Sequence, residues 1–421
     1  MSRILLTWEL GMNLGHLTRL LPIATRLKAR GHSVLVAARD LASAAAVLGP
    51  AGISFVQAPH LPQGIPLPHR PTGYADILLS QGWSDRSALW GLVHGWLNLY
   101  RMFRPEVVVH DYSPTARLAT RIAGIPSVLV GNGFELPPAT NPLPPFPGFS
   151  WATPEKAAES ERIAVANANA VASAFGTKGI EALYQLLQGQ AVLFATFPEL
   201  DHYGSRADAR YVGPLLGKLN VERVDWPEGS GNRIFACLRP DTQNVEAILG
   251  GLLASEASVV CFARGFSREK LDRYHHPRIR FVSRPIDLKH LVSDAQLCVS
   301  YGAEGTMATF LLVGVPQLVS PWQVEAHMAA QRIEALGAAI VLRGPQTVET
   351  GAALIRETID ESEYRASAQA FQCGHSSFKT EGVSEMALGS LELIRSASRL
   401  QTQTPLSGVE RREARTQKVF T

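Results

Sequence analysis

Apolar and polar positions in the first half of the chain follow two alternating patterns. Leucines and an isoleucine recur at helical spacing over 17–30, and this pattern stops at Gly31. Short continuous apolar runs, each followed by a loop-forming or charged residue, lie at 3–9, 33–39, 106–111 and 126–132. Continuous apolar runs of this length favour buried strands, whereas the 3.6-residue spacing favours amphipathic helices. The pattern predicts repeated strand–loop–helix–strand units.

The alternation restarts in the second half. Residues 213–232 lose periodicity and gather turn-forming residues, which is typical of a linker. Beyond the linker, strands are predicted at 233–238, 258–263, 279–283 and 295–300, and helices at 244–255 and 288–294. Strands that alternate with helices form parallel sheets through right-handed crossovers. We therefore expect an α/β fold with two Rossmann-like, doubly wound parallel-sheet domains that face each other across a cleft.

The length of the chain agrees with two domains. A total of 421 residues with 46% hydrophobic content is more than one compact core normally holds. We place the first domain at 1–217 and the second at 230–375. A helix at about 376–396 is expected to complete the first domain. The tail at 397–421 is polar, mildly basic and aperiodic, so we interpret it as disordered, with partner binding as an alternative.

Charge and cysteine usage exclude several classes of protein. The formal net charge is +3, and basic residues are scattered among acidic ones except near the end, so neither nucleic acid nor a membrane surface is an expected partner. The four cysteines are widely spaced, which favours reduced thiols over a disulfide framework or a zinc site. No stretch approaches the roughly 18 apolar residues of a transmembrane span, and the start does not resemble a secretory signal. The cytoplasm is the expected location.

Two segments of the first domain are candidates for a ligand site. Residues 59–104 contain Trp83 and Trp90, and the proline-rich segment 134–149 begins with Phe134. Long irregular segments at the carboxyl edge of a parallel sheet commonly shape binding sites, so we expect these three aromatic side chains to contact a ligand. Helix core is the alternative for each tryptophan.

A glycine-containing loop follows the strand that ends at Ser300. The sequence "SYGAEGTMATFLLVGVP" predicts a loop, a helix that begins near Gly305 and a further strand. The free amides at the start of a helix attract anions, and glycine lets a phosphate group approach the backbone. The loop is therefore a candidate phosphate site. Alone it is a weak signal, because many α/β loops contain two glycines.

The motifs around this loop resemble the donor-binding signature of GT-B glycosyltransferases, especially bacterial family 1 enzymes related to macrolide, glycopeptide and flavonoid glycosyltransferases. The amino-terminal "GHLTRLLPIATRLKARGHSV" is similar to their first-domain signature. The likeness extends over about residues 1–395. The matching positions in the second half are Gly302, Gly305, Thr306, Gly314, Pro316, Glu325, Arg332 and Gly337.

The resemblance implies a nucleoside-diphosphate sugar donor, a UDP- or dTDP-sugar, bound by the second domain. By position, Gly305 and Thr306 would meet the diphosphate and Glu325 the sugar hydroxyls. Pro285 and the backbone of Ile286 would meet the nucleobase. Arg239 could add positive charge at the diphosphate, with a surface arginine as the alternative. The full set of implied donor-binding residues is Arg239, Pro285, Ile286, Tyr301, Gly302, Gly305, Thr306 and Glu325.

Three positions depart from the family pattern. Tyr301 stands where relatives commonly have a phosphate-contacting histidine, and a phenol donates one hydrogen bond without a positive charge. Ala326 stands where a glutamine is frequent. Glu304 adds a carboxylate beside the expected anion site, unless it is only a solvated charge. The departures suggest a different donor or a degenerate site.

The resemblance also implies a general base at His16, which follows the first strand. Asp111 ends the strand at 106–111, and parallel strands end along one edge of a sheet, so Asp111 can approach His16. A carboxylate there would orient the imidazole. His110 should point to the other side of the sheet. The alternatives are a structural or capping role for His16 and a helix N-cap role for Asp111.

The function expected from the resemblance is inverting, metal-independent transfer of a sugar to a hydroxyl group. The acceptor would be small or lipid-like and bound by the first domain, with Trp83, Trp90 and Phe134 as contacts. No cofactor and no metal are expected besides the nucleotide sugar. One alternative is a degenerate nucleotide-sugar-binding or regulatory protein without transfer activity. A nucleotide-sugar epimerase is a third possibility, although its additional acidic residues are not recognisable here.

Overall fold

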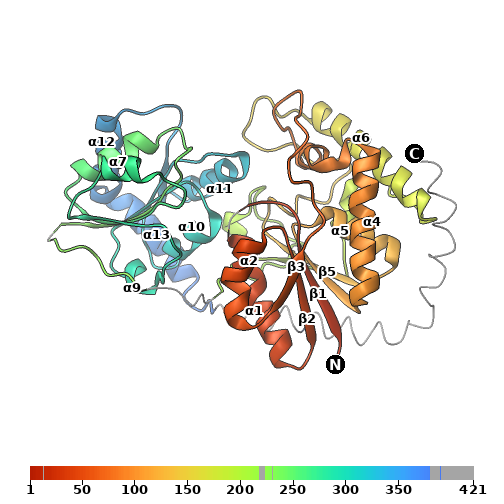
Figure 1. Ribbon diagram of the computed structural model, residues 1–421. Coiled ribbons are helices and arrows are strands. Elements are labelled where there is room, and N and C mark those ends of the chain that lie inside the picture. Colours follow the sequence, from red (N-terminus) through yellow and green to blue (C-terminus); the bar gives the residue numbers. More distant parts are fainter. Residues whose placement is uncertain (13, 218–222, 230, 380–388, 390–421) are drawn as a thin grey trace. The chain divides into compact units, whose positions relative to one another are not determined.

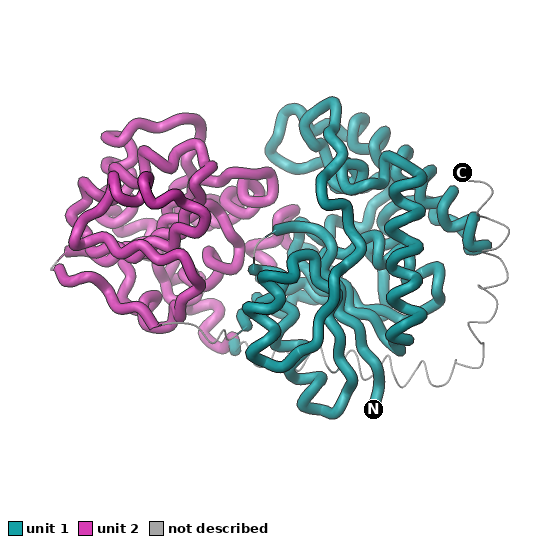
Figure 2. Tube along the Cα trace, viewed as in Figure 1, with its two compact units in different colours: residues 1–197, 206–218, 379–421 teal, residues 198–205, 219–378 magenta. Residues whose placement is uncertain are grey.

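The computed structural model describes residues 1–12, 14–217, 223–229, 231–379 and 389. The described chain forms two compact units, coloured separately in Figure 2. Of the described residues, those in 1–197 and 206–217, with 379 and 389, form the first unit, and those in 198–205 and 223–378 form the second. Residues 198–205, which lie within the 1–217 range given to the first domain, therefore group with the second unit. The predicted helix at 376–396 lies outside the described residues except for 376–379 and 389, and so does the tail at 397–421.

The first unit is a parallel sheet flanked by helices, as Figure 1 shows. Its strands are β1 (Arg3–Trp8), β2 (Ser33–Ala38), β3 (Ser54–Gln57), β4 (Val107–Asp111), β5 (Ser127–Gly131) and β6 (Ala191–Phe194). Its α-helices are α1 (Gly15–Ala29), α2 (Leu41–Leu48), α3 (Tyr74–Leu78), α4 (Arg86–Phe103), α5 (Pro114–Ala123) and α6 (Pro154–Ala174). Short helical turns lie at η1 (Gly49–Ala51), η2 (Leu79–Trp83) and η3 (Leu183–Leu186).

The order of the strands in the first unit is β3-β2-β1-β4-β5-β6. The order reverses between β1 and β4, and α1 and α2 cover one face of the sheet while α4 and α5 cover the other (Figure 1). In doubly wound sheets, ligands bind outside the carboxyl ends of the strands at such a reversal. Trp8 and Asp111 are register partners at the ends of these two strands. These two residues mark the edge of the sheet at which a ligand site is expected.

The second unit repeats this architecture. Its strands are β7 (Arg233–Cys237), β8 (Ser258–Phe262), β9 (Ile279–Val282), β10 (Leu297–Ser300), β11 (Gln317–Val319) and β12 (Ala339–Val341). Its helices are α7 (Val245–Ala254), α8 (Arg268–Asp272), α9 (Lys289–Val292), α10 (Glu304–Leu311), α11 (Val324–Ala335), α12 (Val348–Asp360) and α13 (Ser362–Gly374), with the turn η4 (Pro198–Leu200). The order β12-β11-β10-β7-β8-β9 reverses between β7 and β10.

The central position of β4 and β5 in the sheet explains why their sequences are almost wholly apolar. All five residues of β4 and all five of β5 are buried, because helices cover both faces of a parallel sheet. In α1, by contrast, only the stripe that faces the sheet is buried, including Leu17, Leu20 and Leu27. Within the described residues, no helix has the length and apolar character needed to cross a membrane. The predicted fold class of two doubly wound parallel sheets is confirmed.

Candidate active site

His16 is the second residue of α1 and lies just beyond the loop that follows β1, rather than on the strand end itself. The imidazole stacks on the Trp8 ring with centroids 5.3 Å apart and lies 6.1 Å from the Tyr112 ring. Tyr112 has φ 43°, a left-handed conformation that is uncommon for a residue with a side chain. The side chain of His16 is therefore held between two aromatic rings at the carboxyl edge of the sheet.

Gly11 allows the imidazole to lie against the loop backbone. Its φ is +79°, and a β-carbon added at this position would lie 2.4 Å from Nε2 of His16. A contact of that length does not occur between real atoms, so the position of His16 requires glycine at residue 11. The loop after β1 thus fixes the imidazole from the side opposite to its hydrogen-bonding partners on Nδ1.

Asp111 pairs with His16, as we expected because parallel strands end along one edge of a sheet. Nδ1 of His16 lies 2.8 Å from Oδ1 of Asp111, and the Asp111 side chain is fully buried. His110, the preceding residue, points to the other face of the sheet and contacts Thr7 at 3.0 Å and Thr120 at 3.1 Å. The alternation of side chains along β4 therefore separates the two histidines.

The N-cap alternative for Asp111 is not what the structure contains. Ser113 occupies the N-cap position of α5, and its hydroxyl donates to the backbone oxygen of Asp111 at 2.9 Å. The free amides of the first turn of α5, those of Thr115 and Ala116, donate instead to Oε2 of Glu9 at 3.0 and 3.1 Å. Because Glu9 accepts from these amides, the carboxylate of Asp111 is available to His16. Burial raises the pKa of the Glu9 carboxyl group to about 7.

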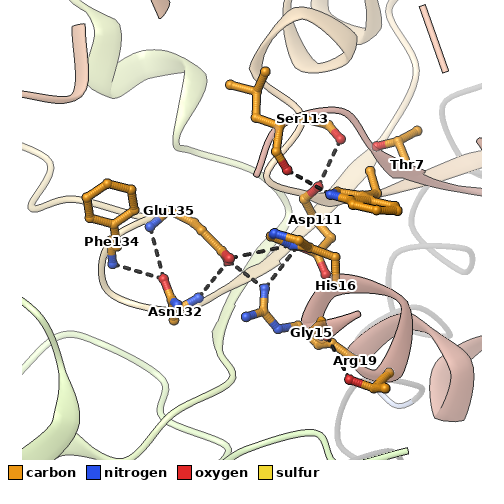
Figure 3. A network of polar contacts seen from close by, with 12 residues as sticks. Thr7, Gly15, His16, Arg19, Asp111, Ser113, Asn132, Phe134 and Glu135 are labelled. Carbon is orange, nitrogen blue, oxygen red and sulfur yellow. Dashed lines mark hydrogen bonds and ion pairs between the residues drawn. The ribbon is translucent and has the colours of Figure 1, made fainter. Parts of the chain in front are cut away.

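Two further charged side chains complete the cluster in Figure 3. Nη1 of Arg19 donates to Oδ1 of Asp111 at 2.9 Å and to Oε2 of Glu135 at 2.5 Å. Oε1 of Glu135 lies 3.6 Å from Nδ1 of His16. Arg19 is one helical turn after His16 on α1, and Glu135 follows β5. The sequence interpretation missed both, although the helical spacing of Arg19 from His16 was a usable signal for Arg19.

A tight turn places Glu135 in this cluster. The amides of Phe134 and Glu135 donate to Oδ1 of Asn132 at 3.0 and 3.1 Å, and the amide of Asn132 donates to Oε2 of Glu135 at 2.9 Å. A β-carbon on Gly131 would lie only 2.6 Å from that same carboxylate oxygen. Glycine is therefore needed where β5 ends, because the Glu135 carboxylate folds back against the strand.

The electrostatics of the cluster favour a protonated His16. Burial alone lowers the pKa of His16, but the adjacent carboxylates of Asp111 and Glu135 outweigh burial and raise the pKa above its ordinary value. A raised pKa contributes folding stability below the pKa of the unfolded chain, and this contribution is lost as pH rises through the folded value. On the other face of the sheet, burial lowers the pKa of His110 well below its ordinary value.

The imidazole of His16 and the carboxylates of Asp111 and Glu135 are close enough to share a metal ion, since their ligand atoms lie within 4.8 Å of one another. Arg19, however, donates to both carboxylates. Its guanidinium supplies the positive charge that the carboxylates require and would repel a cation. This donor set fits an ion pair with arginine better than it fits a metal.

The expected acceptor residues have three different environments. Trp83 is fully buried, and its indole N–H donates to Oγ1 of Thr115 at 3.0 Å, so the helix-core alternative describes it and it offers no surface to a ligand. Trp90 is partly exposed and stacks on His94, with ring centroids 4.9 Å apart. Phe134 is buried and stacks on Phe146 at 5.4 Å. An acceptor contact remains a prediction for Trp90 and Phe134.

In the second unit, Arg239 and Tyr301 follow the ends of β7 and β10, where the strand order reverses. The guanidinium carbon of Arg239 lies 4.0 Å from the centroid of the Trp322 ring and 5.8 Å from that of Tyr301. Nε and Nη2 of Arg239 each donate to Asp241 at 3.0 Å. Arg239 is therefore held in place by aromatic rings and a carboxylate. Trp322 was not singled out from the sequence.

The loop after β10 leads into α10 as predicted, although the helix begins at Glu304, one residue before Gly305. Its N-cap, Ala303, has no side chain that could accept from the first amides. Gly305 is exposed, and Thr306 is partly exposed. Glu304 also has partners among the described residues. No side chain of the N-cap residue caps this helix start, whose positive end can attract an anion.

The remaining candidate residues follow the carboxyl ends of β9, β10 and β11. A β-carbon added to Gly302, whose φ is +90°, would lie 2.9 Å from the β-carbon of Ala326. Ala326 is buried, so it packs against the loop. Glu325, in the first turn of α11, accepts a hydrogen bond from Gln323 at 3.2 Å. Pro285 and Ile286 lie between β9 and α9 and are partly buried.

Comparisons with known proteins agree with this architecture. Residues 247–378 match the family of the erythromycin biosynthesis protein CIII-like C-terminal domain. A PGL/p-HBAD biosynthesis glycosyltransferase of Mycobacterium tuberculosis is 23% identical over 305 residues, which cover 63% of this chain and 65% of that protein. A PGL/p-HBAD biosynthesis rhamnosyltransferase of Mycobacterium bovis is 24% identical over 304 residues, 63% of this chain and 62% of that protein. The match thus spans less than two thirds of either relative.

Solved structures with the same fold extend over nearly the whole chain. Glycosyltransferase VinC, in complex with dTDP, has a TM-score of 0.68 at 19% identity and covers 94% of this chain and 100% of its own. The spinosyn rhamnosyltransferase SpnG has a TM-score of 0.63 at 18% identity and covers 92% and 99%. The resemblance inferred from the motifs is confirmed: the chain has the GT-B fold of these glycosyltransferases, and residues 247–378 match the erythromycin biosynthesis protein CIII-like C-terminal family.

Proposed function

We propose that the protein is an inverting, metal-independent glycosyltransferase that transfers a sugar from a nucleoside diphosphate to a hydroxyl group of a small or lipid-like acceptor. The observation that carries the proposal is the hydrogen bond of 2.8 Å between Nδ1 of His16 and the buried Asp111. Such a pair is the arrangement of a general base with its orienting carboxylate. The relatives named glycosyltransferase and rhamnosyltransferase support the same reaction class.

In the proposed reaction, Nε2 of His16 takes the proton of the acceptor hydroxyl while its oxygen forms a bond to the anomeric carbon of the sugar. The bond from that carbon to the diphosphate oxygen breaks, and the nucleoside diphosphate leaves with the electron pair. Attack opposite the leaving group inverts the anomeric centre. Nδ1 holds its position toward Asp111, which leaves Nε2 as the nitrogen that takes the proton.

The second unit is proposed to bind the donor. The amides at the start of α10 would meet the diphosphate, with Gly302, Gly305 and Thr306 beside them. Arg239 would add the positive charge that Tyr301 lacks, since both side chains lie at the reversal of the sheet. Glu325 would bind sugar hydroxyls, and Pro285 and Ile286 would contact the base. A thymidine nucleotide is the first donor to test, because VinC and SpnG were solved with thymidine diphosphate.

One second candidate has an observation in its favour. Tyr301 carries no positive charge, and Ala326 is buried against Gly302, so two sugar-nucleotide contacts common in the family are missing. These departures would suit a nucleotide-sugar-binding protein that lacks transfer activity. The intact His16–Asp111 pair favours the enzyme, because a protein that only binds has no need of an oriented base.

Donor binding provides a first test. Thymidine or uridine diphosphate should raise the melting temperature, and a hundredfold excess over the dissociation constant corresponds to about 2.7 kcal/mol of added stability. Gly302→Val should abolish this nucleotide-induced rise, because the new side chain would clash with the β-carbon and backbone oxygen of Ala326 in α11 and so displace the loop that carries residue 302.

Gly344→Val is the matched control for this test. Gly344 also has a positive φ, +71°, but a β-carbon there meets nothing within 4 Å. Each variant is compared with its own nucleotide-free melting curve, so that a general loss of stability cancels. If no nucleoside diphosphate or nucleotide sugar stabilises the wild-type protein, or if both variants respond like wild type, the donor site is wrongly assigned.

A further inference from the structure

The cluster around His16 contains more charge than a base with one orienting carboxylate needs. Asp111 and Glu135 each bring a carboxylate within 3.6 Å of Nδ1, and Arg19 bonds to both. All four side chains are at most 11% exposed, so water screens them little. The second carboxylate and the guanidinium therefore need an explanation beyond the orientation of His16.

The charge balance gives an answer. Two carboxylates and one guanidinium leave an excess of one negative charge when the imidazole is neutral, and the cluster becomes balanced when His16 takes a proton. Asp111 and Arg19 alone would already be balanced with a neutral imidazole. Buried unbalanced charge is unfavourable, so the additional carboxylate favours the imidazolium form.

We propose that Glu135 and Arg19 are positioning residues of the reaction: Glu135 stabilises His16 after it has taken the acceptor proton, and Arg19, which donates to both carboxylates, offsets part of their negative charge beside the imidazole. The inference rests on the proposed function, because it assigns these roles to the same base. It extends that function, since neither residue belongs to the His16–Asp111 pair.

Several contacts hold the Glu135 side chain in place. The Asn132 turn fixes its backbone, Gly131 leaves room for its carboxylate, and Arg19 and the Asn132 amide both donate to Oε2. Oε1 is the oxygen that faces His16 at 3.6 Å. The ionisable groups that face the imidazole are Arg19 from α1, Asp111 from β4, Tyr112 from the segment before α5 and Glu135 from the segment after β5.

The test measures the protonation of His16 directly, by NMR titration of the imidazole in the full-length protein. Glu135→Gln removes a negative charge while keeping the shape of the side chain, so the pKa of His16 should fall. Arg19→Met removes the positive charge, so the same pKa should rise. A residue that served only packing would not move the pKa in opposite directions in these two variants.

Two further variants support the interpretation. Gly131→Ala leaves every charge unchanged but displaces the Glu135 carboxylate, so the pKa of His16 should fall as in Glu135→Gln. Glu159→Gln is the control, because Glu159 pairs with Arg162 on the exposed surface of α6 and should leave the titration of His16 unchanged. Far-ultraviolet circular dichroism reports whether each variant folds.

Activity supplies a second readout. A base acts when it is neutral, so the acid limb of kcat/KM should move to lower pH in Glu135→Gln and to higher pH in Arg19→Met. An unchanged His16 titration in both charge variants, or shifts in the same direction, would overturn the inference. If the titration shifts as expected but no sugar transfer is found for any acceptor, the proposed function fails while the electrostatic roles of Glu135 and Arg19 stand.

Discussion

Replacing His16 with alanine should lower kcat at least about 100-fold, because a positioned general base typically contributes 10²- to 10⁴-fold. The imidazole stacks on the rings of Trp8 and Tyr112 and is hydrogen-bonded to Asp111. Alanine at residue 16 therefore removes an oriented base from this position. Nucleotide-induced stabilisation should stay nearly unchanged in His16→Ala, since the proposed donor-binding residues belong to the second unit. Single-turnover transfer and donor titration together separate these two effects.

Asp111→Asn should reduce kcat as well, because an amide can present its N–H to Nδ1 and favour the wrong tautomer of the imidazole. The double variant should lose about as much activity as His16→Ala alone, since residues that act as one unit are not additive. Wild-type turnover in His16→Ala would exclude His16 as the base. Additive losses in the double variant would show that Asp111 acts independently of His16.

The pairing of His16 with Asp111 could be predicted because it depends on regular structure. Parallel strands end along one edge, and side chains alternate along each strand, so Asp111 and His110 had to face opposite sides of the sheet. The contacts of His110 with Thr7 and Thr120 agree with that alternation. The start of α10 was predictable for the same reason, since strand, loop and helix followed in order.

Arg19 and Glu135 were not predicted, because their meeting depends on an irregular turn. They are 116 positions apart in the chain, and Glu135 reaches the cluster only through the Asn132 turn and the space beside Gly131. Hydrophobic periodicity carries no information about such a turn. Arg19, three residues after His16 on the same helix, was the one member that helical spacing could have identified.

Burial also decides between alternatives that the sequence left open. Trp83 was expected near an acceptor, yet it packs in the core because its indole N–H finds a buried partner in Thr115. Ala326 stands where relatives often have glutamine, and its β-carbon lies against Gly302. A longer side chain at residue 326 must therefore move this loop. The departure from the family pattern is a packing adjustment as well as a lost polar group.

The second large effect is expected from Gly11→Ala, a change at a residue that has no chemical role of its own in the proposed reaction. The new β-carbon would lie 2.4 Å from Nε2 of His16, so the imidazole must move away from its present position. A misplacement of about 1 Å can cost 10²-fold in rate, and we expect kcat to fall by about that factor. The alanine also bears the strain of a left-handed conformation, about 1–2 kcal/mol.

Gly31→Ala separates the strain from the displacement. Gly31 has the same φ of +79°, but a β-carbon there meets nothing within 4 Å. Both variants should lose a similar amount of stability to backbone strain in urea unfolding, whereas only Gly11→Ala should lose activity. Measuring kcat and unfolding for the pair distinguishes the two effects. Proton transfer by a positioned imidazole requires Nε2 to stay within hydrogen-bonding distance of the acceptor hydroxyl, so equal activity in both variants would contradict the proposed role of His16.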